Sequence, residues 1–433
     1  MQIQRNSYLN KLISKRENGL IKVITGIRRC GKSYLLFTIY RDYLLSIGVS
    51  ENQIIELALD ETKNAKYRNP IELDNYIRGL VLDKSKRYYV FIDEIQKVED
   101  IQNPFISDKN AKIGFVDTLL GLMKLQNVDL YVTGSNSRML SSDILTEFKD
   151  RGDEIRVAPL TFKEFYDAYE GDKNNAWQEY ITYGGMPLAV TKKTHEEKSR
   201  YLKGLFSKTY ITDVIERNGI LNDKETLEDL LNLISSSVGS LTNPTKISNT
   251  FASIKQVKIS PSTISTYLDY FIDAFIINKA YRYDVKGKKY IDTPLKYYFT
   301  DVGLRNARLN FRQQEENHIM ENIIYNELLF REYDVDVGVV EYNYKDELGK
   351  SKRAQLEIDF VANKSSKRYY IQSALNIDSA DKKEQETKSL NRIADSFKKI
   401  VIVKDNIIPW HDEQGILYIG IQQFLLDESA VDL

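Results

Sequence analysis

Residues 26–33 read Gly26-Ile27-Arg28-Arg29-Cys30-Gly31-Lys32-Ser33. An apolar run precedes this stretch at 20–25, and a helical pattern that begins Ser33-Tyr34 follows it. A strand, a glycine-rich loop and a helix in this order predict a phosphate-binding P-loop, whose backbone N–H groups meet phosphate oxygens at the helix N-terminus. We expect Lys32 to reach the β- and γ-phosphates of a nucleotide and Ser33 to bind Mg²⁺. The predicted nucleotide-binding segment therefore runs from Gly26 to Tyr34.

Two further apolar runs end in polar residues. The run at 87–92 leads into Asp93 and Glu94, the form of a Walker B strand. Because phosphoryl transfer depends on positioning and charge stabilisation, we expect Asp93 to hold Mg²⁺ through water and Glu94 to orient the attacking water. The run at 128–133 leads into Asn136, which stands where a polar side chain could contact the γ-phosphate. The alternative for Asn136 is an ordinary turn residue.

Several segments together resemble the prokaryotic AAA+ ATPases of the archaeal-type group, which are similar to the STAND-related clade. These segments are the P-loop with Arg28 and Arg29, Asp93-Glu94-Ile95-Gln96, Thr133-Gly134-Ser135-Asn136-Ser137, Pro159-Leu160-Thr161-Phe162-Lys163-Glu164-Phe165 and Gly184-Gly185-Met186-Pro187. The resemblance covers most of the chain and is most specific before residue 190. It implies ATP and Mg²⁺ as cofactors, ATP hydrolysis, and a homo-oligomer in which an arginine reaches the γ-phosphate bound to a neighbouring copy.

The same resemblance assigns roles to three further residues. It implies that Gly185 and Pro187 lie near the nucleotide from the side of a helical lid. It places Arg151 where such ATPases keep an arginine, which makes Arg151 the candidate arginine finger. Those ATPases more often have Gly-Arg there, whereas this chain reads Asp150-Arg151-Gly152. Arg138 is the competing candidate, and the alternative for both arginines is a solvated loop charge.

The composition is that of an ordinary globular protein. Of 433 residues, 42% are hydrophobic and 28% are charged, enough chain and apolar content for several domains. The single cysteine, Cys30, excludes an internal disulfide and suits a reducing cytosol; we interpret it as a space-filling residue, the alternative being a thiol whose modification blocks nucleotide binding. Scattered histidines give no zinc pattern. A polar N-terminus and the absence of a long apolar run predict a cytoplasmic protein without membrane contact.

Positive charge gathers in one region, although the net charge of the chain is −1. Residues 243–308 hold 11 Lys or Arg, 5 Asp and no Glu. Helix starts at Asn243 and Ser260, followed by a hairpin, predict a winged helix. In a DNA-binding version, Ser262, Thr263, Ser265 and Thr266 would face the major groove, and Lys286, Lys288 and Lys289 would contact phosphate. The alternative is a winged helix used for assembly or regulation.

The C-terminal region looks like the core of PD-(D/E)XK nucleases, with a helix at 315–332, three strands, a helix at 382–396 and a strand at 400–403. There a helix Glu and a strand Asp hold Mg²⁺, positions that Glu321 or Glu327 and Asp359 fit, with Gln372 on the next strand. The lysine that should follow is replaced by Ala374. We therefore expect a degenerate nuclease fold used for binding or assembly.

The sequence thus predicts an α/β protein with four parts: a P-loop AAA+ core with a parallel sheet (1–160), a helical lid (161–220), a winged helix (221–310) and a nuclease-like α/β domain (311–433). The expected function is a DNA-associated ATPase that couples hydrolysis of Mg²⁺-ATP to DNA binding or remodelling. The alternative is a nucleotide-controlled switch or scaffold that binds a protein partner. A third reading, an active metal-dependent DNA nuclease, is disfavoured by Ala374.

Overall fold

The computed structural model of this chain describes residues 3–108, 110–134, 148, 151–220, 223–312, 315–345 and 349–433. The chain divides into two compact units, residues 1–159 and 160–433. Among the described helices, none is both long enough and apolar enough to cross a membrane.

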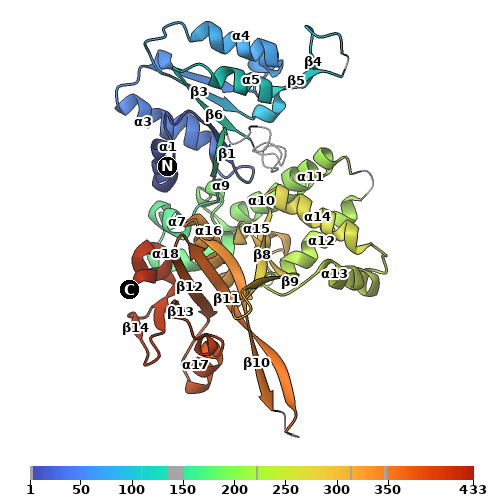
Figure 1. The fold of residues 1–433 in the computed structure, drawn as a ribbon, viewed down its shortest axis with the longest axis vertical. Helices are drawn as coiled ribbons and strands as arrows, with labels where there is room; N and C mark the ends of the chain where they lie inside the picture. Colours follow the sequence, from blue (N-terminus) through green and yellow to red (C-terminus); the bar gives the residue numbers. More distant parts are fainter. Residues whose placement is uncertain are drawn as a thin grey trace. The chain divides into compact units, whose positions relative to one another are not determined.

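The first unit is built on a five-stranded sheet in which every neighbouring pair of strands is parallel (Figure 1). In spatial order the strands are β2 (Ile54–Ala58), β3 (Tyr88–Asp93), β6 (Val128–Thr133), β1 (Ile21–Thr25) and β7 (Gly152–Arg156). All residues of β1, β3 and β6 are buried, as expected of central strands covered on both faces. The predicted parallel sheet of the P-loop core is confirmed.

Helices cover both faces of this sheet. They are α1 (Asn6–Ser14), α2 (Lys32–Tyr34), α3 (Arg41–Ser46), α4 (Pro70–Leu80) and α5 (Phe115–Met123), with a π-helical stretch Leu35–Tyr40 joining α2 to α3. Short 3-10 turns lie at Glu51–Gln53, Thr62–Arg68 and Ile95–Lys97, and a small hairpin is formed by β4 (Ile101–Gln102) and β5 (Lys112–Ile113). Apolar side chains of α4 and α5 pack with Val23 and Val90 of the sheet. On the other face the ring of Tyr40 lies 5.8 Å from that of Phe91 and 5.0 Å from that of Tyr131.

The second unit begins with helices. They are α7 (Phe162–Ala168), α8 (Ala176–Tyr183), α9 (Pro187–Val190), α10 (His195–Leu205), α11 (Ile211–Asn218), α12 (Lys224–Ser236), α13 (Pro244–Thr250) and α14 (Pro261–Asp273), with a 3-10 turn at Lys173–Asn175 and π-helical stretches at Phe206–Tyr210 and Phe251–Lys255. Two predicted helix starts are confirmed, because the Asn243 side chain accepts from the N–H of Lys246 and that of Ser260 accepts from the N–H of Thr263.

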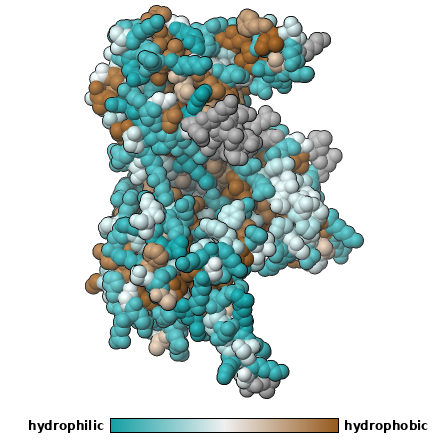
Figure 2. Space-filling model, viewed as in Figure 1, coloured by the Kyte–Doolittle hydropathy of each residue, from teal (hydrophilic) through white to brown (hydrophobic). Residues whose placement is uncertain are grey.

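An eight-stranded mixed sheet forms the rest of the second unit. In spatial order its strands are β14 (Trp410–His411), β15 (Leu417–Gly420), β13 (Lys398–Val403), β12 (Lys367–Ala374), β11 (Ser351–Lys364), β10 (Asp334–Lys345), β8 (Ile277–Asp284) and β9 (Lys289–Phe299). The accompanying helices are α15 (Val302–Arg308), α16 (Glu316–Phe330), α17 (Ala380–Thr387) and α18 (Ile421–Leu426), with 3-10 turns at Leu390–Arg392 and Glu428–Asp432. β10 and β11 extend together beyond the strands on either side of them, and Figure 2 shows mostly hydrophilic residues on this extension.

Two features of the second unit differ from the expectation. The β8–β9 hairpin, expected as the wing of a separate domain ending at residue 310, pairs through β8 with β10 and is one edge of the C-terminal sheet. A parallel pairing between strands this far apart leaves no local signal in sequence. The helix expected at 382–396 ends at Thr387 as α17, and a 3-10 turn follows.

Candidate nucleotide site and a second charged pocket

The predicted P-loop has the backbone that its sequence requires. Gly26 and Gly31 have φ values of 137° and 99°, and Arg29 lies in the left-handed region at 67°. A Cβ on Gly26 would stand 2.0 Å from the carbonyl oxygen of Val157, so only glycine fits there. Gly31 is the N-cap of a continuous helical run that begins at Lys32. The loop therefore connects the carboxyl end of β1 to a helix N-terminus, where backbone donors are unpaired within the helix.

The Lys32 ammonium lies on this loop. Its Nζ donates to the carbonyl oxygens of Gly26 at 2.9 Å and Ile27 at 3.2 Å, and the residue is 5% exposed. Ser33, Tyr34, Arg28 and Arg29 are exposed. A lysine held by loop carbonyls and a neighbouring exposed hydroxyl form a donor set that fits the phosphates and Mg²⁺ of a nucleoside triphosphate.

Arg5, which was not among the residues predicted from the sequence, stabilises the loop by joining it to the segment after β7. Its guanidinium donates to the carbonyl oxygens of Cys30 at 3.2 Å and Ala158 at 2.8 Å. The Cys30 thiol is fully buried and lies 3.3 Å from the carbonyl oxygen of Val157. Cys30 therefore fills space between the loop and the segment after β7. No pattern in the sequence links Arg5 to a loop this far along the chain.

The predicted Walker B carboxylates lie at the end of β3. Asp93 is 7% exposed and accepts a hydrogen bond from the hydroxyl of Thr133, the last residue of the neighbouring strand β6. That hydroxyl also accepts from the N–H of Glu94 at 3.3 Å. Glu94 has a φ of 54°, a left-handed conformation that costs about 1–2 kcal/mol for a non-glycine residue. Its carboxylate accepts from the amide of Gln96.

Parallel strands bring these groups to one edge of the sheet. β6 lies between β1 and β3, so the start of the P-loop, Thr133 and Asp93 all stand at carboxyl ends of adjacent parallel strands. Ligands of open α/β sheets bind at this edge. Thr133 was not among the predicted residues, although its place at the end of a buried strand before Gly134 could have indicated it. Asn136 and Arg138 lie outside the described residues.

Arg151 stands at the opposite edge. It is exposed and directly precedes β7, and its carbonyl oxygen accepts from the N–H of Ile21, the first residue of β1, at 2.9 Å. Since the P-loop follows the other end of β1, Arg151 is separated from the P-loop of its own chain by the length of the strand.

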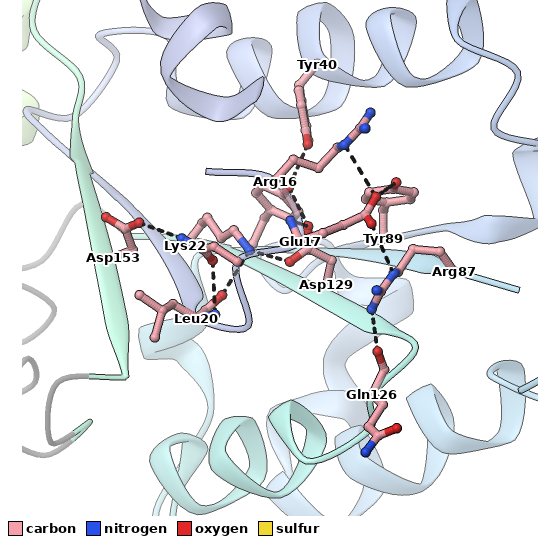
Figure 3. A network of polar contacts seen from close by, with 12 residues as sticks. Arg16, Glu17, Leu20, Lys22, Tyr40, Arg87, Tyr89, Gln126, Asp129 and Asp153 are labelled. Atoms are coloured by element: carbon pink, nitrogen blue, oxygen red, sulfur yellow. Dashed lines mark hydrogen bonds and ion pairs between the residues drawn. The ribbon is translucent and has the colours of Figure 1, made fainter. Parts of the chain in front are cut away.

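A buried polar network fills this opposite edge (Figure 3). Lys22 of β1 is paired with Asp129 of β6, and its ammonium also donates to the carbonyl oxygen of Leu20 at 3.0 Å. Asp129 accepts from Tyr131 at 2.7 Å and from the N–H of Glu17 at 3.0 Å. Burial outweighs the attraction of Asp129 and lowers the pKa of Lys22. The Lys22–Asp129 pair joins β1 to the neighbouring strand β6.

In the second unit, packing requires the glycines of Gly184-Gly185-Met186-Pro187. Gly184 has a φ of 68°, and a Cβ on Gly185 would stand 2.1 Å from the carbonyl oxygen of Leu160. The N–H of Gly185 donates to Asp301 at 2.6 Å, and Pro187 is the first residue of α9. Burial raises the pKa of Asp301 to about 6.

The predicted basic hairpin exposes its lysines. Lys286, Lys288 and Lys289 are all exposed at the turn between β8 and β9, and Lys286 Nζ donates to the carbonyl oxygen of Glu341 at 3.1 Å. On α14, Ser262 and Thr266 are exposed, whereas Thr263 and Ser265 are half-buried.

A pocket of about 450 Å³ lies between the helices and the sheet of the second unit. It brings together Glu321, Asp359 and Gln372, three of the residues predicted from the nuclease-like pattern. Glu327, the alternative to Glu321, instead pairs with Arg331 at 2.7 Å. Ala374 is buried in an apolar cluster.

Lys296, which the sequence did not indicate, enters this pocket from β9. Its Nζ lies 2.8 Å from Glu321 Oε1 and 2.6 Å from Glu357 Oε1. Burial alone would lower the pKa of Lys296, but the charges of Glu321, Asp359 and Glu357 outweigh it and raise that pKa. Burial and the charge of Glu321 raise the pKa of Asp359 well above its usual range.

Family models match two segments of the chain. Residues 18–166 match the family described as AAA domain, which confirms the predicted AAA core, and residues 174–315 match a domain of unknown function (DUF8612). The Walker-type ATPase of Pyrococcus abyssi superposes with a TM-score of 0.47 at 16% identity, covering 71% of this chain and 96% of that one.

Two curated relatives cover nearly the whole chain. An uncharacterized protein of Methanocaldococcus jannaschii is 29% identical over 94% of this chain and 85% of its own length. An uncharacterized protein of Haemophilus influenzae is 35% identical over 92% of this chain and 93% of its own length. The chain therefore belongs to the same protein family as the Haemophilus influenzae protein, and its residues 18–166 are an AAA domain.

Proposed function

We propose that this chain binds Mg²⁺-ATP at the loop 26–33 and hydrolyses it. The observation that carries the proposal is the common edge of β1, β6 and β3, where the Lys32 loop, Thr133 and the Asp93-Glu94 pair meet. Hydrolysis of a phosphoanhydride needs a cation-lined cradle for the phosphates and a carboxylate beside the attacking water. Both kinds of group are present at this edge.

Each residue has a distinct part in this proposal. The Lys32 ammonium exchanges the carbonyl oxygens of Gly26 and Ile27 for phosphate oxygens. Ser33 and Asp93 hold Mg²⁺, which when bound neutralises charge that develops on the phosphates. Thr133 keeps the carboxylate of Asp93 in one orientation, since it donates to that carboxylate. Glu94 orients and polarises the water that attacks the γ-phosphorus.

The proposal includes a homo-oligomer. Arg151 is exposed at the sheet edge opposite the P-loop of its own chain, which suits a residue that acts on a neighbouring copy. We retain Asn136 as a further residue at the nucleotide, and residues 161–220 as a proposed division of the second unit.

Binding is tested with Lys32→Ala. Loss of the ammonium removes a charge-assisted contact to the phosphates, so we expect affinity for a fluorescent ATP analogue to fall at least about tenfold. Lys97→Ala, an exposed lysine in the same unit, is the matched control and should bind as the wild type does. Equal affinity of Lys32→Ala and wild type for the ATP analogue would show that Lys32 does not contact the phosphates.

A second candidate function is DNA association, which the exposed turn with Lys286, Lys288 and Lys289 favours. Its three ammonium groups lie within four residues, so they would contact neighbouring phosphates of a nucleic acid together. Each contact would release a counterion from the nucleic acid, which makes binding sensitive to salt. The exposed Ser262 and Thr266 of α14 are the proposed base-reading side chains.

Salt dependence tests this candidate. The triple variant Lys286/Lys288/Lys289→Ala should weaken duplex binding and reduce the slope of log affinity against log salt by about 2–3. The triple variant Lys63/Lys84/Lys97→Ala makes the same charge change at exposed positions of the first unit and should leave the slope unchanged. If wild type shows no salt-sensitive binding to duplex or forked DNA, the alternative of a nucleotide-controlled switch for a protein partner is favoured.

A further inference from the structure

The pocket of the second unit is lined by several carboxylates, which need a positively charged partner. A nuclease-like arrangement implies a divalent metal ion bound by Glu321 and Asp359. Both residues line the pocket, together with Glu357 and the amide of Gln372. Carboxylate and amide oxygens are the donors that Mg²⁺ and Mn²⁺ prefer, so the chemistry of the donors alone would suit such an ion.

The position of Lys296 does not fit a metal ion. The side chain of Lys296 is 4% exposed, and its ammonium lies 2.8 Å from Glu321 and 2.6 Å from Glu357. Tyr298, two residues further along β9, donates to the same oxygen of Glu321 at 2.5 Å. Among the residues that the structure describes, no group of three or more His, Cys, Asp or Glu side chains is arranged to hold a metal, so an ion bound here after loss of the ammonium requires these side chains to move. The carboxylates surround the ammonium instead.

The surroundings hold Lys296 in this position. β9 is paired with β8 through residues on both sides of Lys296, and the Glu321 carboxylate is fixed by Tyr298. Asp359 accepts from the N–H of Ser373 at 2.8 Å, so it also has a partner within the sheet. A divalent ion at the same oxygens would meet a like charge in a buried setting, where such repulsion is weakly screened.

We propose that the Lys296 ammonium occupies the cation position of this pocket. The pocket therefore binds no divalent metal ion, and it becomes a metal site only when the charge of Lys296 is removed. In this proposal Lys296 supplies the positive charge that the nuclease-like pattern expects from a lysine at position 374, where this chain has Ala374. Ala374 lies in the apolar cluster, whereas Lys296 supplies the positive charge directly among the carboxylates.

The test is Mn²⁺ binding by the full chain without nucleotide, followed by electron paramagnetic resonance. Wild type should show no bound Mn²⁺ that depends on Glu321, so its titration should match that of Glu321→Gln. Lys296→Met keeps the length of the side chain and removes its charge. It should bind one more Mn²⁺ per chain than wild type, and the apparent affinity for Mn²⁺ at this pocket should rise at least about tenfold over that of wild type. Lys345→Met, at an exposed lysine of β10 in the same sheet, is the matched control and should behave as wild type does.

A double variant locates the new site. Lys296→Met/Glu321→Gln should lose the Mn²⁺ that Lys296→Met gains. One Mn²⁺ bound by wild type and lost in Glu321→Gln would overturn the proposal, as would Lys296→Met that is folded by circular dichroism and binds no additional ion. Should Lys296→Met fail to fold, the comparison of wild type with Glu321→Gln still decides, because the proposal requires that the two do not differ.

Discussion

Glu94→Gln should retain ATP binding and lose at least about 100-fold in turnover, the contribution typical of a positioned carboxylate that acts on a proton or on water. The substitution keeps the size of the side chain and its place after Asp93, so the phosphate contacts of Lys32 are unaffected. The left-handed backbone at Glu94 and the bond from its N–H to Thr133 do not depend on the carboxylate. Turnover measured by phosphate release and affinity measured with a fluorescent ATP analogue separate the two effects.

Glu99→Gln is the matched control, because Glu99 is an exposed glutamate of the same segment. It should hydrolyse ATP at the wild-type rate. Normal turnover by Glu94→Gln would show that another group positions the water, and loss of binding would show that Glu94 supports the loop and not the reaction.

The second large effect concerns the stability of the first unit. Asp129→Ala should destabilise this unit by about 3–5 kcal/mol, because removing one partner of a buried ion pair leaves the other charge without compensation. Lys22 is 0% exposed, and its ammonium is paired with Asp129. The substitution also removes the acceptor of Tyr131 and of the N–H of Glu17.

Hydrogen exchange is the suitable measurement, since a two-unit chain need not unfold in one step. Peptides from β1 and β6 should exchange faster in Asp129→Ala, while peptides from β11 and β12 in the second unit should not change. Lys22→Met/Asp129→Asn removes both charges and keeps the acceptor for Tyr131, so it should recover most of the lost protection. Equal protection in Asp129→Ala and wild type would mean that the buried pair contributes nothing to stability.

The sequence predicts the phosphate-binding edge well because its signals are local. The apolar runs at 20–25, 87–92 and 128–133 correspond to β1, β3 and β6 within one residue at each end. Glycine is required where φ is positive, which ties Gly26 and Gly31 to a loop of fixed shape. A strand, a turn and a helix that follow each other directly leave little freedom for any other arrangement.

Contacts between distant segments were not predictable in the same way. Arg5 reaches Cys30 from the N-cap position of α1, and Lys296 reaches Glu321 and Glu357 from a strand expected to be a wing. Both depend on how elements pack and not on a local pattern. The pairing of β8 with β10 likewise depends on which strand edges meet. The 3-10 turn Thr62–Arg68 depends on packing in the same way, since Tyr67 packs against Tyr76 of α4.

Turnover of ATP by the purified full chain is the most direct test of the central claim, that the loop 26–33 and the Asp93-Glu94 pair form one hydrolytic site. We predict Mg²⁺-dependent phosphate release that is abolished by EDTA and by Lys32→Ala, and unchanged in Lys97→Ala. Release that persists in Lys32→Ala would assign the activity to another site. A wild-type chain that binds ATP and releases no phosphate, alone or with DNA, would contradict the claim that the site is hydrolytic.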